Sequence, residues 1–157
     1  LTPSDQLSTL GPVDVVLAFD IIDRSADPDA LFAAGRAVLD PGGLLLATTT
    51  LGSGFDIQML WERAERIYPP ERINLLSESG LRALWERHGF EVIEFSTPGV
   101  FDVEIVRQAI EADSEADWPR FIRYLVERVD EGGLEAFQEY LQRFRLSSFA
   151  RVALRKI

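Results

Sequence analysis

The chain has 157 residues, of which 46% are apolar and 27% charged, a composition typical of a globular protein with one proper core. Its 26 acidic and 16 basic residues give a net charge of −10, which argues against a nucleic-acid ligand, because binding to that backbone rests on Lys and Arg. The absence of cysteine excludes disulfides, thiolate zinc sites and cysteine nucleophiles.

Strands and helices are predicted to alternate from the start of the chain. Residues 13–19 are apolar and β-branched at nearly every position, as in a parallel strand buried on both faces. An Asp-Pro pair then begins a helix predicted over residues 28–39, which Pro-Gly-Gly ends. Residues 44–50 are predicted to form a second buried strand.

The same cycle follows once more. Apolar residues at helical spacing predict a helix over 55–68, ended by two prolines. A serine N-cap begins a helix predicted over 77–88, and a glycine follows it. Residues 90–96 alternate between apolar and polar, which predicts a third strand.

The last third of the chain has a different pattern. Residues 102–144 look wholly helical, in three pieces, and Glu-Gly-Gly at 131–133 is predicted to separate the last two. Residues 149–157 alternate as in an antiparallel strand. This order predicts an α/β fold with a mainly parallel sheet. Ligands bind such sheets at the carboxyl ends of the strands, here residues 19–23 and 48–54.

Three stretches resemble class I S-adenosylmethionine-dependent methyltransferases. VDVVLAFDIIDRSADPDALFAAGRAVLDPGGLLLATT resembles their fourth strand, fourth helix and fifth strand; INLLSESGLRALWERHGFEVIEFSTPG resembles the segment through their sixth strand; RLSSFARVALRKI resembles their seventh strand. The resemblance implies a single methyltransferase-like domain over 1–157 with a partial Rossmann-like sheet. In that sheet the family strands lie in the order 4-5-7-6, the last strand is antiparallel, and residues 102–144 are a helical insertion before it.

One family feature has no counterpart in this sequence. Family members open with a strand and a Gly-rich loop that holds much of the cofactor, and no strand followed by such a loop occurs here. We therefore expect the chain to correspond to the C-terminal half of a methyltransferase. In the family order the strand at 13–19 is internal. Its bare edge is expected to be covered by an N-terminal half or by a second copy in a homodimer.

The resemblance also implies a site for the cofactor, S-adenosylmethionine. It places Phe19, Asp20, Ile21 and Ile22 near the methionine end of this molecule. There the Asp20 carboxylate would accept hydrogen bonds from the ammonium group. The alternative is that Asp20 only caps the loop that follows the strand.

Acceptor-binding residues are expected along the same rim. Candidates from position and resemblance are Thr49, Thr50, Tyr68, Arg72 and Asn74, with Trp61 nearby. Threonines at such positions are more often ordinary strand formers, and the aromatic residues more often pack in a core. The only histidine, His88, is predicted to end a helix. The aspartates at 20, 23, 27 and 29 lack the glycine and glutamate of a calcium loop, so no metal site is predicted.

Two functions follow from these residues. The first is a portion of an S-adenosylmethionine-dependent methyltransferase that acts on a small-molecule acceptor. The alternative is a catalytically inactive methyltransferase-like module for binding or assembly, and an upstream strand with a Gly-rich loop would favour the first. No apolar run is long enough to cross a bilayer and no basic-then-apolar leader occurs, so we expect a soluble, cytoplasmic protein without a membrane partner.

Overall fold

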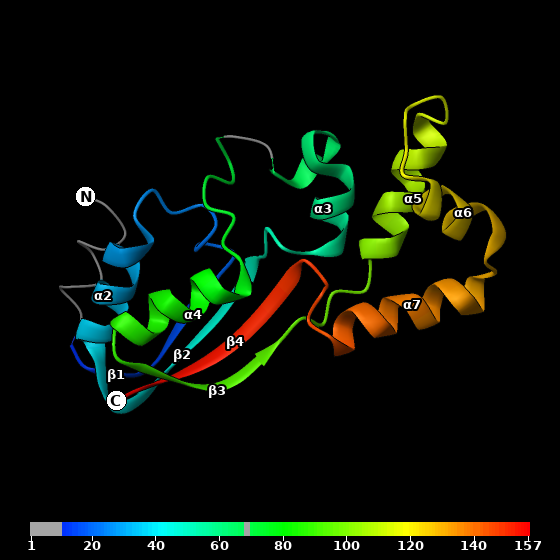
Figure 1. Cartoon of the computed structure of the whole chain (residues 1–157). Coiled ribbons are helices and arrows are strands. Elements are labelled where there is room, and N and C mark those ends of the chain that lie inside the picture. Colours follow the sequence, from blue (N-terminus) through cyan, green and yellow to red (C-terminus); the bar gives the residue numbers. More distant parts are fainter. Residues whose placement is uncertain (1–10, 68–69) are drawn as a thin grey trace.

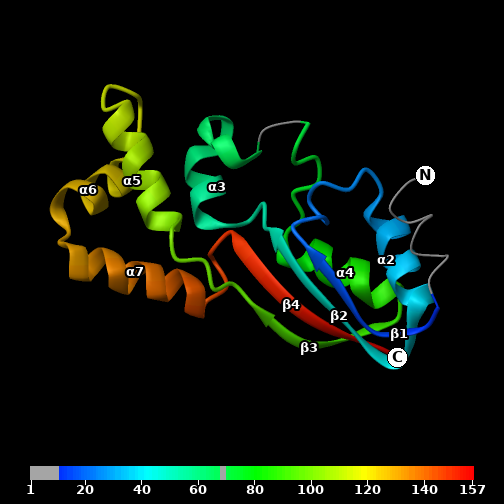
Figure 2. The same cartoon turned by 180° about the vertical axis from the view of Figure 1, so that it is seen from behind.

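The computed structural model describes residues 11–67 and 70–157. A sheet occupies one side of the molecule, and a group of helices extends beyond one end of it (Figure 1). Helices α2, Pro28–Val38, and α4, Glu78–Arg87, both lie on the same face of the sheet, as the view from behind also shows (Figure 2).

The sheet has four strands among the described residues. They are β1, Val13–Phe19; β2, Leu39–Thr50; β3, Phe90–Ser96; and β4, Phe149–Lys156. Their order is β1-β2-β4-β3, with β1 parallel to β2 and with β4 antiparallel to both of its neighbours. The predicted α/β class, the strand order and the antiparallel last strand are therefore confirmed.

The N-terminal part of β2 differs from the prediction. The Pro-Gly-Gly sequence was expected to turn the chain before a strand at 44–50, but β2 already begins at Leu39. Gly42 adopts a φ of +80°, and the pairing register between β1 and β2 is irregular at Val13 and Val15. The strand continues through this irregularity because glycine accepts a positive φ at little cost.

The core of the sheet is formed against α2 and α4. Trp85 of α4 and Phe32 of α2 are fully buried there, and the ring of Phe32 meets that of Phe90 edge to face. Both helices begin at side-chain caps, because Asp27 accepts a hydrogen bond from the Ala30 amide at 2.9 Å and Ser77 accepts one from Gly80 at 3.2 Å. Local sequence signals thus fix where the helices begin, and apolar burial fixes which face they cover.

The predicted helix over 55–68 is wrong beyond its first turn and a half. Helix α3 spans Phe55–Leu60 and is followed by two 3-10 turns, η1 at Trp61–Arg63 and η2 at Glu65–Ile67. Trp61 has a φ of +44°, which an α-helix does not allow, so the helix ends at this residue. Its side chain is 61% exposed, and the core-packing explanation for Trp61 is therefore also wrong.

The helical insertion is confirmed in three pieces. They are α5, Asp102–Ala112; α6, Arg120–Arg128; and α7, Glu131–Arg143. The Glu-Gly-Gly sequence does not separate α6 from α7 but forms the first turn of α7. The Asp130 side chain caps that turn by accepting a hydrogen bond from the Gly133 amide at 2.9 Å.

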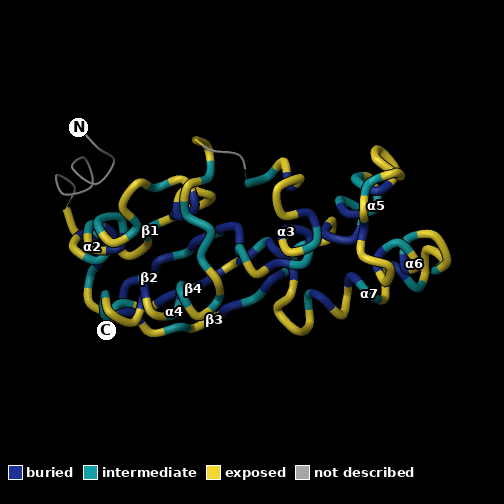
Figure 3. The backbone as a smooth tube through the Cα atoms, turned by 45° about the horizontal axis from the view of Figure 1, so that its top comes forward, coloured by how far each residue is buried: buried dark blue, intermediate teal, exposed yellow. Residues whose placement is uncertain are grey.

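A second apolar core lies in the helical region. Helix α3 belongs to this core, because Ile57 and Leu60 pack with Val106, Ile110 and Ile122 of α5 and α6. Figure 3 shows buried segments both along the sheet and in this helical group. Within the described residues, no helix combines the length and the apolar character needed to cross a bilayer.

Candidate functional site

The carboxyl ends of β1 and β2 meet at the rim of the sheet, and Asp20 lies at this point. The Asp20 amide donates to the Thr48 carbonyl at 3.0 Å, and the Thr48 hydroxyl donates to the Asp20 carboxylate at 3.1 Å. Asp20 has a φ of +53°, a region that few residues other than Gly, Asn and Asp occupy. Backbone held in this way is concentrated at functional sites, so Asp20 is the first residue of the candidate site.

Large apolar side chains flank Asp20 on the open face of the sheet. Phe19 is 54% exposed, and Ile21 is also exposed. A shallow hollow of about 510 Å³ lies beside Phe19, over the adjacent strands β2 and β4, with Thr48 and Arg151 in its wall. Ile22 differs from these residues because its side chain is buried in the sheet core. Of the four predicted cofactor residues, Phe19, Asp20 and Ile21 therefore face outward.

The predicted acceptor residue Arg72 is engaged inside the chain. Its guanidinium group donates to the carboxylate of Asp23, which is fully buried, and to the Thr50 hydroxyl at 2.5 Å. The Asp23 carbonyl accepts from the amides of Ile73 at 2.8 Å and Asn74 at 3.0 Å. These contacts hold the segment before α4 against the ends of β1 and β2.

The remaining predicted acceptor residues fall in three different surroundings. The side chains of Thr49 and Thr50 are buried, and the side-chain amide of Asn74 donates to the Ser25 carbonyl. Tyr68 lies outside the described residues. The threonines at the end of β2 were expected to contact the acceptor, whereas the structure brings Thr48 to Asp20, because Phe19 pairs with Thr48 in the parallel register. That register was the missing signal.

Sequence reasoning also missed the role of Asp23. The sequence places Asp23 at the rim, and the structure shows that it is one half of a buried ion pair with Arg72. Among the described residues, no group of three or more His, Cys, Asp or Glu side chains is placed to hold a metal ion.

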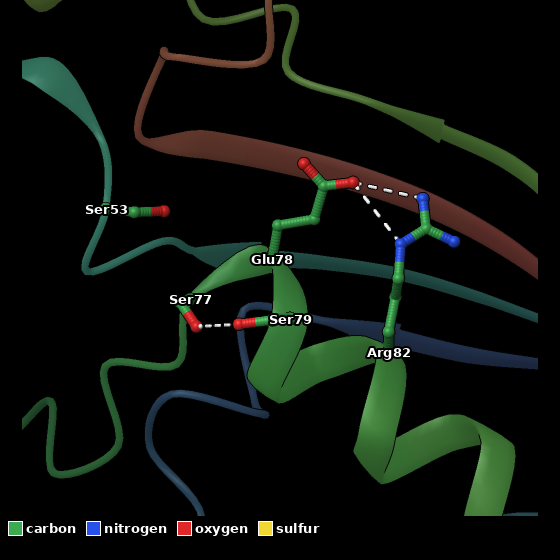
Figure 4. A pocket seen from close by; sticks show the side chains of 5 residues that line it. All are labelled: Ser53, Ser77, Glu78, Ser79 and Arg82. Carbon is green, nitrogen blue, oxygen red and sulfur yellow. Dashed lines mark hydrogen bonds and ion pairs between the residues drawn. The ribbon is translucent and has the colours of Figure 1, made fainter.

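A second hollow, of about 400 Å³, lies at the start of α4 (Figure 4). Its charged groups are already paired. Glu78 accepts from Arg82 at 3.0 Å and from Arg145 at 3.0 Å, and Ser77 caps the helix. This hollow therefore presents no group that requires a ligand.

His88 lies at the opposite end of the sheet from the rim. It follows the last residue of α4 and its Nε2 is 2.7 Å from the Asp29 carboxylate. The hydrogen bond from His88 and the charge of Arg87 hold the pKa of Asp29 below its usual value, more than desolvation raises it. These contacts join α4 to α2, and they place His88 away from the candidate site.

Residues 2–95 match a family described as a methyltransferase domain. This stretch contains β1, the whole Asp20 rim and the Asp23–Arg72 pair. No curated protein sequence matches the chain.

Solved structures with the same fold include three with named sources. A SAM-dependent methyltransferase from Thermotoga maritima has a TM-score of 0.55 and 16% identity, over 96% of this chain and 61% of its own. The cyclopropane synthase MmaA2 from Mycobacterium tuberculosis has a TM-score of 0.52 and 20% identity, over 98% and 58%. Phosphoethanolamine N-methyltransferase 2 from Haemonchus contortus, in complex with S-adenosyl-L-methionine, has a TM-score of 0.51 and 24% identity, over 91% and 33%.

At these identities the comparisons establish the fold. The chain spans between one third and about three fifths of the length of these three proteins.

Proposed function

Because this chain belongs to the methyltransferase-domain family, we propose that it forms part of an S-adenosylmethionine-dependent methyltransferase that acts on a small-molecule acceptor. The observation that carries the proposal is the rim itself. The family match includes the turn after β1, where an exposed aspartate with a positive φ lies between two exposed apolar side chains. Two solved structures of this fold support the same cofactor, because their descriptions name it.

In this proposal Asp20 and its neighbours bind the methionine end of the cofactor. The Asp20 carboxylate accepts hydrogen bonds from the ammonium group, and Thr48 holds that carboxylate in place. Phe19 and Ile21 supply apolar contact beside it. Methyl transfer needs mainly in-line positioning of the two reactants and exclusion of water, and for some acceptors a base as well.

On the acceptor side, the buried predicted residues act by positioning. Thr50 and Arg72 join Asp23 to hold the segment before α4, and Asn74 holds it to Ser25. The side chain of Thr49 supports the same strand end from the core. We assign the choice of acceptor to residues 102–144, because α3 at the end of β2 packs on these inserted helices.

Calorimetric titration with S-adenosylhomocysteine tests the role of Asp20. We expect binding with a Kd on the order of 100 µM. We expect Asp20→Asn to weaken it about tenfold, because a charge-assisted hydrogen bond contributes about 1.5–3 kcal/mol. Asparagine tolerates a positive φ, so the fold is retained. Asp14→Asn, at the other end of β1, is the matched control, and equal affinities of the two variants would remove Asp20 from the site.

The uncovered side of β1 is a second part of the proposal. Val15, Leu17 and Phe19 are exposed along one face of this strand, and β1 pairs only with β2 among the described residues. Sheet edges of this kind are normally covered. We propose that in the functional form a second copy of the chain, or an N-terminal half of methyltransferase type, covers this edge.

Sedimentation analysis at micromolar concentration tests the second-copy form. The unmodified chain is expected to be a dimer, and Leu17→Lys is expected to be a monomer with unchanged secondary structure, since Leu17 is 59% exposed. Ile93→Lys places the same charge at an exposed position of β3, on the opposite edge, and is expected to remain dimeric. If the unmodified chain is a monodisperse monomer, a second copy does not cover this edge, and an N-terminal half of methyltransferase type remains as the cover.

The alternative function is an inactive methyltransferase-like module for binding or assembly. The Asp23–Arg72 pair and the exposed edge of β1 are compatible with it as well. It predicts that S-adenosylhomocysteine does not bind at the rim, whereas self-association persists. The two experiments together therefore separate the two functions.

A further inference from the structure

Three connecting segments meet where the sheet joins the helical group. They are the connections from β2 to α3, from β3 to α5 and from α7 to β4. The Leu51 amide donates to the Ser148 carbonyl at 2.7 Å, and the Phe55 amide donates to the Leu146 carbonyl at 2.7 Å. Gly54 is in such close contact with Ser148 that a Cβ atom would lie 2.2 Å from the Ser148 Cα. We call this meeting point the junction.

Asp102, the first residue of α5, is the central acceptor of the junction. It is buried and accepts hydrogen bonds from the Ser147 hydroxyl at 2.6 Å, the Ser148 amide at 2.7 Å and the Gln138 side-chain amide at 2.8 Å. Gln138 also donates to the Gly99 carbonyl at 2.8 Å. Three donors directed at one carboxylate fix its position at the junction.

Asp56, in the first turn of α3, is a second buried carboxyl group at the junction. Its side chain is only 1% exposed, and neither of its oxygens has a well-formed hydrogen bond among the described residues. The nearest cation is the partly exposed Arg66, whose Nη1 lies 3.6 Å from the Asp56 Oδ2. A carboxylate buried in this way is costly unless it is paired or protonated.

The surroundings of Asp56 favour its neutral form. Burial raises the pKa of Asp56 most strongly, and the charge of Asp102 raises it further. The Ser148 hydroxyl and the Arg66 guanidinium group lower this pKa, but by less. Ser148 is itself buried, and its hydroxyl oxygen can accept a hydrogen bond from Asp56 when Asp56 is protonated.

We propose that Asp56 attaches α3 to the junction when it is protonated and weakens this attachment when it is ionised. When it is protonated, its carboxyl group lies beside Asp102 and Ser148 without repulsion and holds α3 to the connection before β4. When it is ionised, its charge and that of Asp102 are both buried and repel each other, and the first turn of α3 loosens. Because Ile57 and Leu60 of α3 pack in the core of the helical region, a looser first turn of α3 also weakens its packing on the inserted helices.

The direction of the pH dependence follows from this arrangement. The pKa of Asp56 is higher in the folded chain than its usual value, so the folded state binds more protons than the unfolded state does. Its contribution is fully present below the unfolded pKa and is lost as the pH rises through the folded pKa. The folding equilibrium constant is expected to fall by about a factor of ten for each unit by which the pKa is raised.

Urea unfolding of the full chain from about pH 4, near the unfolded pKa of an aspartate, up to about pH 8 tests the proposal. The difference in unfolding midpoint between Asp56→Asn and the unmodified chain is expected to grow with pH in favour of the variant, because asparagine keeps the shape of the acid without its titration. Parallel pH profiles of the two proteins would overturn the proposal. Glu91→Gln, at an exposed side chain of β3, is the control and is expected to follow the unmodified chain.

A direct measurement covers the case in which Asp56→Asn does not fold. In ¹³C carboxyl NMR of the unmodified chain, one buried Asp carboxyl is expected to titrate above the ordinary Asp pKa of about 3.9. The protection of α3 amides from hydrogen exchange, relative to their intrinsic rate at each pH, is expected to fall over the same pH range, while that of α4 amides does not. If all Asp carboxyls titrate at or below the ordinary value, the proposal is wrong.

Discussion

Arg72→Met is expected to destabilise the fold by about 3–5 kcal/mol, because it leaves the buried Asp23 charge without its partner. Asp23 is fully buried, and the Arg72 guanidinium group is the only cation within ion-pair distance of it among the described residues. The Thr50 hydroxyl would also lose a donor. Urea unfolding of the purified variant measures this loss of free energy.

Arg24→Met is the matched control for Arg72→Met. Arg24 pairs with Glu71 at 3.7 Å, but both side chains are largely exposed, so the expected cost is about 0.5 kcal/mol or less. Combining Asp23→Asn with Arg72→Met removes both charges and is expected to restore a large part of the lost stability. Similar costs for Arg72→Met and Arg24→Met would show that the Asp23–Arg72 pair does not hold the rim together.

Gly54→Ala is expected to cost about 3 kcal/mol or more, because the added methyl group has no space. Its Cβ would lie 2.2 Å from the Ser148 Cα and 2.6 Å from the Ser148 amide nitrogen, and backbone atoms cannot move aside as a flexible side chain can. The φ of Gly54 is −68°, which any residue adopts, so the cost is wholly steric. Thermal unfolding of the variant is the measurement.

Gly132→Ala tests the same substitution where space is free. The nearest atom to its Cβ would be the Asp130 Oδ1, at 3.8 Å. Gly132 lies in the first turn of α7, where alanine is a better helix former, so stability is expected to rise by about 0.5 kcal/mol. If Gly54→Ala changes the stability by no more than Gly132→Ala does, the junction is not tightly packed.

Much of the fold was predictable because its signals are local. The apolar run at 13–19 and the caps at Asp27 and Ser77 placed the first strand and two helices to within a residue or two. The strand order, by contrast, came from the family resemblance, since pairing partners leave no mark in a single strand. The helix predicted over 55–68 failed because its apolar spacing continues beyond Trp61, whereas the backbone turns at Trp61 itself.

The site was only partly predictable because its contacts connect distant segments. Asp20 was predicted from its position after the strand at 13–19 and from the family resemblance, which places residues 19–22 near the cofactor. Its partner Thr48 depends on the register of two parallel strands. The ion pair between Asp23 and Arg72 joins residues 49 positions apart, and neither residue type specifies the other in the sequence.

In the proposed function, the Asp20 rim binds the cofactor of a methyltransferase. Titration of S-adenosylhomocysteine into the ¹⁵N-labelled chain, followed by amide chemical shifts, tests this binding. We expect shifts at Asp20, Ile21 and Thr48, and none at His88 or Lys156, which lie at the opposite end of the sheet. The absence of shifts at up to about 5 mM ligand, or shifts confined to another part of the chain, would contradict the claim.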